Sequence, residues 1–222
     1  MPAETPSPET TNRRSAMFRG AVGFAGVSAA AFSIWAFGGG LFRGFGGEGS
    51  LYAAIAAAFI GLSGPALHRL VPGGGIGRFY RLFGPAFAAY SVVWSAAWFV
   101  LKSALGEWIG AAAGSLAFVG VLSVAQRRPV GFAPAAVGFF LLHSAGYFSG
   151  GLSMDLLVGL ARKSAEPDVR AAWFAAAKLS WGVFYGLGFG AGLGLALATL
   201  QPRTVSPFPD RSAAPATDPS VR

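Results

Sequence analysis

The sequence predicts an all-α, polytopic membrane protein: a bundle of six transmembrane helices between polar termini. Two compositional observations and one pattern carry this prediction. Of the 222 residues, 54% are hydrophobic and only 12% are charged, whereas a soluble domain carries about 25% charged residues. The mean hydropathy is +0.54. Apolar runs of about 20 residues, enough to cross a ~30 Å hydrocarbon core at ~1.5 Å per residue, recur along the chain.

Six apolar segments are long enough to span. We expect helices over about 17–38, 51–70, 84–103, 107–126, 131–150 and 174–199. Glycine-rich stretches after the first two segments are typical of turns. The polar, proline-rich ends, 1–16 and 201–222, cannot bury enough apolar surface to fold, so we expect disordered cytoplasmic tails. The first apolar run is longer than a signal-peptide core and is expected to be retained as a helix.

The segment between the fifth and sixth spans, "SMDLLVGLARKSAEPDVRAAW", has apolar residues at helical spacing. Ser153 could cap a helix here, and a helix would end before Pro167. Two interpretations stay open: a short amphipathic helix on the outer surface, or an ordered loop.

Basic residues in short loops favour the cytoplasmic side of a membrane. With a cytoplasmic N-terminus, the inner set is larger than the outer set. The inner residues are Arg13, Arg14, Arg19, Arg69, Arg78, Arg81, Arg127, Arg128, Arg203, Arg211 and Arg222; the outer residues are Arg43, Lys102, Arg162, Lys163, Arg170 and Lys178. Four tryptophans at the outer helix ends are typical of an aromatic belt: Trp35, Trp98, Trp108 and Trp173. We therefore expect a bacterial cell (inner) membrane protein with both termini cytoplasmic.

The net charge of +8 could also indicate nucleic-acid binding. That function needs basic residues gathered on one face or one helix. Here they are scattered at the ends of apolar segments, so we expect the lipid bilayer, and no nucleic acid, as the partner.

Glycines recur every four residues in two spans: Gly182, Gly186, Gly190 and Gly194 in the last, and Gly106, Gly110 and Gly114 in the fourth. Residues four apart share a helix face. Such a glycine zipper lets another backbone approach closely. The partner helix could belong to the same bundle, which we favour, or to another subunit of an oligomer. A phosphate loop would need a Lys-Ser or Lys-Thr pair after the glycines, and none is present.

His143 stands about 13 residues into the fifth span, in "GFFLLHSAGYFSGG". Ionisable residues inside spans usually face the protein interior. The imidazole could bond to a neighbouring helix, or it could face an outward polar cavity. The candidate cavity residues are His143, Ser144, Tyr147, Lys178, Tyr185, Lys102 and Glu107. Alternatively, the two lysines and Glu107 extend to the outer interface.

Several chemistries lack the residues they need. The chain has no cysteine, which excludes disulfides and thiolate metal sites. No His-x-x-x-His pair, nucleophile elbow or Walker motif is present, so we predict no catalytic and no metal site. His68, near the inner end of the second span, and His143 lie at different depths, which disfavours a bis-histidine haem. Whether any haem or pigment binds stays unknown.

Two classes of function remain. The first is a non-catalytic subunit or scaffold that packs through glycine faces, alone, as a homo-oligomer or with a membrane-protein partner. The alternative is a small-solute transporter or channel using a cavity around His143. An intramembrane enzyme is a distant third.

Overall fold

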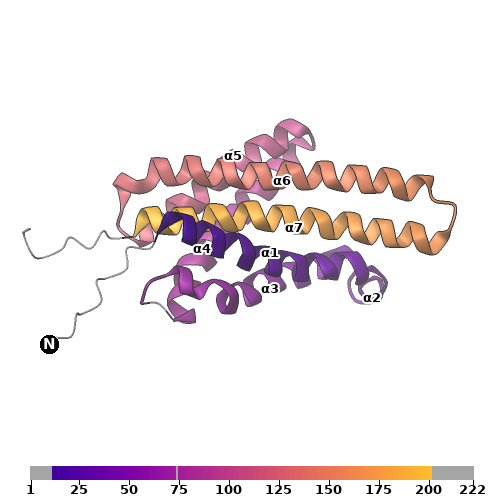
Figure 1. Ribbon diagram of the computed structural model, residues 1–222, viewed down its shortest axis with the longest axis horizontal. Coiled ribbons are helices and arrows are strands. Elements are labelled where there is room, and N and C mark those ends of the chain that lie inside the picture. The colour runs from indigo at the N-terminus through magenta and orange to yellow at the C-terminus, as the bar shows by residue number, and fades with distance from the viewer. Residues whose placement is uncertain (1–11, 74, 202–222) are drawn as a thin grey trace, which may run out of the picture.

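The computed structural model describes residues 12–73 and 75–201, apart from the side chain of Glu48, and all regular structure in that part is helical (Figure 1). The elements are α1 (Arg13–Phe37), α2 (Gly39–Arg43), α3 (Gly47–Leu67), η1 (His68–Leu70), α4 (Ile76–Leu101), α5 (Ala104–Ala125), η2 (Pro129–Gly131), α6 (Phe132–Lys163) and α7 (Pro167–Leu200). Six of these helices are long and apolar enough to cross a membrane. The predicted all-α, six-span architecture is confirmed.

Helix α7 lies at the centre of the bundle. It packs most extensively against α6 on one side and α1 on the other, and α4 pairs with α5. Figure 1 shows α6, α7 and α1 side by side, with α3 beyond α1. The glycine-rich half of α7 is its most buried part, because it lies between α6 and α1.

Both ends of the described chain lie at one end of the bundle, because α1 begins beside the end of α7 (Figure 1). We call this the arginine-rich end, and its basic residues are Arg13, Arg14, Arg19, Arg69, Arg78, Arg81, Arg127 and Arg128. The described residues there include no Asp or Glu. The opposite end mixes basic residues with Glu107, Asp155, Glu166 and Asp168. The charge asymmetry seen in the sequence is therefore an asymmetry between two ends of one bundle.

Helices α6 and α7 form a hairpin of 32 and 34 residues, and its turn extends beyond the neighbouring helices (Figure 1). The prediction of a separate surface helix or loop after residue 150 is wrong, because α6 continues without a break to Lys163. The physical reason is pairing: Gly150 packs on Trp181 of α7, and Pro167 stands at the first turn of α7, where proline is tolerated.

Two other boundaries differ from the sequence-based expectations. Helix α4 begins at Ile76, eight residues before the expected start, so Arg78 and Arg81 lie on the helix rather than in a turn. Helix α1 begins at Arg13, and the Asn12 side chain accepts a hydrogen bond from the Arg14 amide at 3.0 Å, which is a typical N-cap. Residues 13–16, expected in the disordered N-terminal tail, thus form the first turn of α1. Apart from these residues, Asn12 and Gln201, the predicted tails lie outside the described residues.

Candidate functional site around His143

His143 lies in the middle of the bundle and is fully buried on α6. Its Nε2 atom is 2.7 Å from the hydroxyl of Tyr90 on α4, within a hydrogen bond. A polar group in a hydrocarbon environment costs several kcal/mol when unpaired. The hydrogen bond between Tyr90 of α4 and His143 of α6 therefore offsets the cost of burying one imidazole nitrogen in the core.

Aromatic rings from every long helix surround this pair. Phe189 of α7 is the centre of the set, and its ring centroid lies 4.6–5.9 Å from those of seven rings. These are Phe24 (α1), Phe87 and Tyr90 (α4), Phe118 (α5), Phe139 and His143 (α6), and Tyr185 (α7). Phe59 of α3 stacks on Phe24 at 5.6 Å. We call this set, with Phe189 and Tyr147 included, the aromatic core.

Glycines determine how closely the helices that carry the aromatic core approach one another. At Gly146 of α6, an added Cβ would lie 2.7 Å from the Cα of Gly188 on α7, and the reverse substitution gives the same distance. At Gly114 of α5, an added Cβ would lie 2.9 Å from the ring of Tyr90. Gly114 therefore leaves the space that Tyr90 occupies when it reaches His143.

The four glycines spaced along α7 face α1 of the same chain. Added Cβ atoms at Gly186 and Gly190 would come within 2.7 Å of α1 atoms in Ala25 and Phe24, respectively. Gly182 faces Phe32, Gly194 faces Ala16 and Met17, and on α5 Gly106 and Gly110 face α4. These faces are thus occupied by helices of the same chain.

Two polar atoms on consecutive residues of α6 lack hydrogen-bond partners among the described residues: His143 Nδ1 and Ser144 Oγ. The indole nitrogens of Trp94 and Trp181, whose rings pack on Tyr147 at 5.8 and 5.7 Å, are in the same situation. If the Tyr90 hydroxyl donates to Nε2, Nδ1 carries a proton without an acceptor; if Nε2–H donates, Nδ1 is an acceptor without a donor. In either tautomer one polar atom of His143 stays unused.

The residues of the candidate cavity fall into two groups. The structure brings His143, Ser144, Tyr147 and Tyr185 together, with the His143 ring centroid 6.0 Å from that of Tyr147 and 5.8 Å from that of Tyr185. The other three, Lys102, Glu107 and Lys178, lie toward the end of the bundle away from the arginine-rich end. Ser144 is 5% exposed and Tyr147 is 7% exposed, so these two residues and His143 are buried, whereas Tyr185 is only partly buried.

The remaining three candidate residues lie outside the buried centre: Lys178 on α7, and Lys102 and Glu107 at the turn between α4 and α5. Lys178 donates from Nζ to the Trp35 carbonyl at 3.2 Å and lies 5.0 Å from that indole ring, so it satisfies a carbonyl in the last turn of α1. Lys102 is the exposed C-cap of α4, with φ 42°, and Glu107 lies in the first turn of α5.

His68 does not approach His143. It lies at the arginine-rich end, where its Nδ1 is 3.1 Å from the Gly64 carbonyl. Within residues 12–73 and 75–201, no three His, Asp or Glu side chains gather as a metal site would require.

Sequence reasoning missed Tyr90 and Phe189, the two residues that define this site. The sequence signal for Tyr90 was weak: its side chain carries a hydroxyl group within an apolar run, and it stands at helical spacing from Phe83 and Phe87. Phe189 is a large ring between Gly188 and Gly190, an arrangement that places one bulky side chain where both neighbouring helices come closest.

No protein-family model matches the chain, and no curated protein or solved structure is significantly similar to it. Its class therefore follows from the fold and the site. Six apolar helices around a closed aromatic core define a multi-pass integral membrane protein.

Proposed function

We propose that this chain is a non-catalytic membrane subunit or scaffold, a rigid bundle whose interior serves packing rather than passage. The observation that carries the proposal is the filled centre: His143 and Phe189 are both 0% exposed, and rings from α1, α4, α5, α6 and α7 pack on Phe189. A solute pathway needs polar groups that line a connected opening. Here the imidazole of His143 is buried and packs against five aromatic rings.

The contacts between helices support the same proposal. The α1–α7 and α6–α7 pairs meet through glycines, so a rocking motion of one helix against another would break backbone contacts at several levels. Alternating access in carriers uses the motion of one group of helices against another. A bundle with close contacts along both sides of its central helix fits a fixed platform better. Its partner is another membrane protein or a second copy of the chain.

A transporter or channel is the second candidate, and one observation favours it. His143 Nδ1 and Ser144 Oγ, on consecutive residues of α6, are buried atoms without partners among the described residues. A small polar solute or water could pair with both in a conformation in which the core opens.

Cysteine accessibility distinguishes the two candidates, because the natural chain has no cysteine. Ser144→Cys is nearly isosteric and places one thiol beside His143, while Ser164→Cys places one in the α6–α7 turn as a positive control. A water-soluble maleimide applied to both sides of the membrane should label position 164 and leave position 144 unlabelled until the protein is denatured. Labelling of folded Ser144→Cys would favour the transporter and contradict the closed platform.

A mass measurement in mild detergent then identifies a stoichiometric partner or a second copy of the chain. A monomer without a partner would contradict the subunit role.

A further inference from the structure

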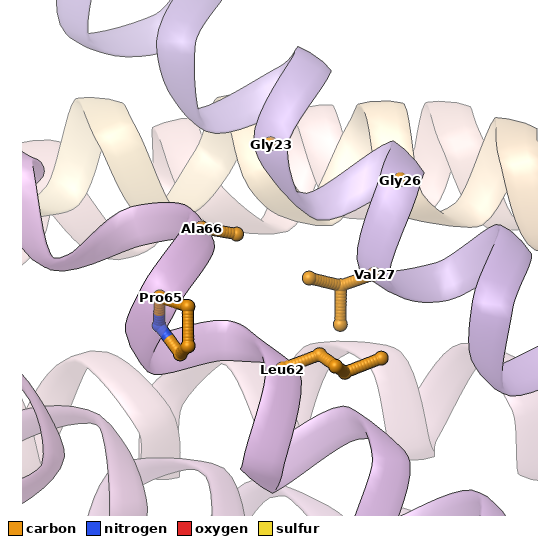
Figure 2. A pocket seen from close by; sticks show the side chains of 6 residues that line it. All are labelled: Gly23, Gly26, Val27, Leu62, Pro65 and Ala66. Carbon is orange, nitrogen blue, oxygen red and sulfur yellow. The ribbon is translucent and has the colours of Figure 1, made fainter.

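A groove of about 450 Å³ lies between α1 and α3. Its lining is apolar and comes from two helices: Gly23, Gly26 and Val27 on α1, and Leu62, Pro65 and Ala66 on α3. Figure 2 shows the side chains of Val27 and Leu62 in the space between the two helices, while Gly26 contributes no side chain on α1. An added Cβ at Gly26 would meet no atom within 4 Å. The groove is thus an unfilled apolar space between two membrane-spanning helices.

Each helix carries an arginine one turn beyond the groove, toward the arginine-rich end. Arg19 precedes Gly23 by four residues on α1, and Arg69 follows Pro65 by four residues in η1. On α1, residues four apart share a helix face, so Arg19 lies on the face of Gly23. Arg19 is eight residues from Val27, about 12 Å along α1. Arg69 lies in the 3-10 helix that follows α3, and five α-helical and two 3-10 residues separate it from Leu62 by about 12 Å. The two exposed guanidinium groups therefore belong at a similar height above the groove.

This combination matches one ligand chemistry. A phospholipid presents an anionic phosphate joined to an apolar acyl chain, and arginine binds phosphate with two parallel hydrogen bonds. The described residues at this end contribute no carboxylate that would compete for the arginines. We propose that the α1–α3 groove binds an anionic phospholipid, with the acyl chain along the groove and the phosphate at Arg19 and Arg69.

The test uses the full chain in mild detergent with dioleoyl phosphatidylglycerol as the probe and native mass spectrometry as the readout. The anionic lipid should remain bound where dioleoyl phosphatidylcholine, with the same chains, does not. Equal binding of both lipids would overturn the proposal, because the arginines would then contribute no selectivity. Inorganic phosphate and glycerol 3-phosphate provide the arm without acyl chains, and competition by either at the affinity of the lipid would refute a lipid site.

Two pairs of charge variants test the headgroup position. Arg19→Gln with Arg69→Gln should weaken phosphatidylglycerol binding by about 25-fold, since one basic residue near an anionic surface corresponds to a factor of roughly five. Arg78→Gln with Arg81→Gln removes the same charge from the same end and should change binding by less than about twofold. Equal losses in both pairs would show general attraction to the arginine-rich end and would contradict a defined site.

A glycine pair tests the acyl-chain position independently of charge. Gly26→Leu fills the groove, whereas Gly84→Leu places the same side chain in open space on α4. We expect Gly26→Leu to weaken lipid binding at least fivefold and Gly84→Leu to leave it unchanged, with both variants keeping the thermal stability of the lipid-free protein. Unchanged binding by Gly26→Leu would place the acyl chain elsewhere. If that variant does not fold, the arginine pairs still decide the outcome.

Discussion

The close contact between α1 and α7 at Gly190 predicts that one added methyl group will push these two helices apart. An added Cβ at Gly190 would lie 2.7 Å from the Gly20 carbonyl carbon and 2.7 Å from Phe24 Cβ. Carbon atoms prefer separations of about 3.5–4.0 Å, so the helices would have to move apart by roughly 1 Å. The stacked rings of Phe24 and Phe189, 4.6 Å apart beside this contact, would separate with them. Overpacking of this kind costs about 1–3 kcal/mol.

Gly159→Ala on α6 is the matched control, because nothing lies within 4 Å of a Cβ at that position. Both substitutions replace glycine by alanine inside a helix, which by itself is favourable by up to about 1 kcal/mol. That contribution cancels between the variants, so their difference in unfolding free energy reports the steric contact alone. We expect Gly190→Ala to be less stable than Gly159→Ala by about 1–3 kcal/mol. The assay is SDS-induced unfolding in mixed micelles, followed by tryptophan fluorescence. Equal stabilisation by both substitutions would refute the close approach of α1 and α7.

Three further predictions use the same assay or simple labelling. His143→Ala should destabilise the bundle more than His143→Gln, and its double-mutant cycle with Tyr90→Phe should give a coupling of about 0.5–1.5 kcal/mol; zero coupling would mean that the hydrogen bond contributes nothing. Phe189→Ala should cost about 3–5 kcal/mol, whereas Phe184→Ala, at a 40% exposed position of the same helix, should cost less than about 1 kcal/mol; similar losses would contradict the central role of Phe189. A cysteine at Ser164 should be labelled from outside the cell and one in the α5–α6 turn only from inside, and labelling of both from one side would exclude the predicted topology.

Hydropathy predicts how many helices cross the membrane, because each crossing needs a long apolar run whatever its neighbours are. It does not predict where a helix ends outside the hydrocarbon. The polar starts of α4 and α7 resemble turns in the sequence, yet they are helical because Gly75 and Pro167 set their first turns. Likewise, the four-residue spacing identifies the glycine face of α7 but not α1 as the helix that lies on it.

The partner of His143 illustrates the remaining gap between sequence and site. Tyr90 is 53 residues away in the chain, and helical periodicity places each side chain on a face without saying which helix that face meets. Helix α4 carries four hydroxyl side chains, Tyr80, Tyr90, Ser91 and Ser95, and the sequence does not say which of them meets another helix. Only the packing of α4 against α5, with Gly114 giving room to the tyrosine ring, selects the imidazole on α6.

The lengths of α6 and α7 set a limit on how this hairpin sits in a membrane. At 1.5 Å per residue, 32 and 34 residues correspond to about 48 and 51 Å, against a hydrocarbon thickness of about 30 Å. Even at a tilt of about 40°, the upper end of the range seen for transmembrane helices, the path through the hydrocarbon is only about 39 Å. Roughly six residues of α6 and eight of α7 must therefore stand in water or among lipid headgroups, and the charged turn around Arg162 and Asp168 is a site where they can emerge. Because α6 and α7 are packed along their length, the turn between them protrudes from the hydrocarbon as a rigid hairpin.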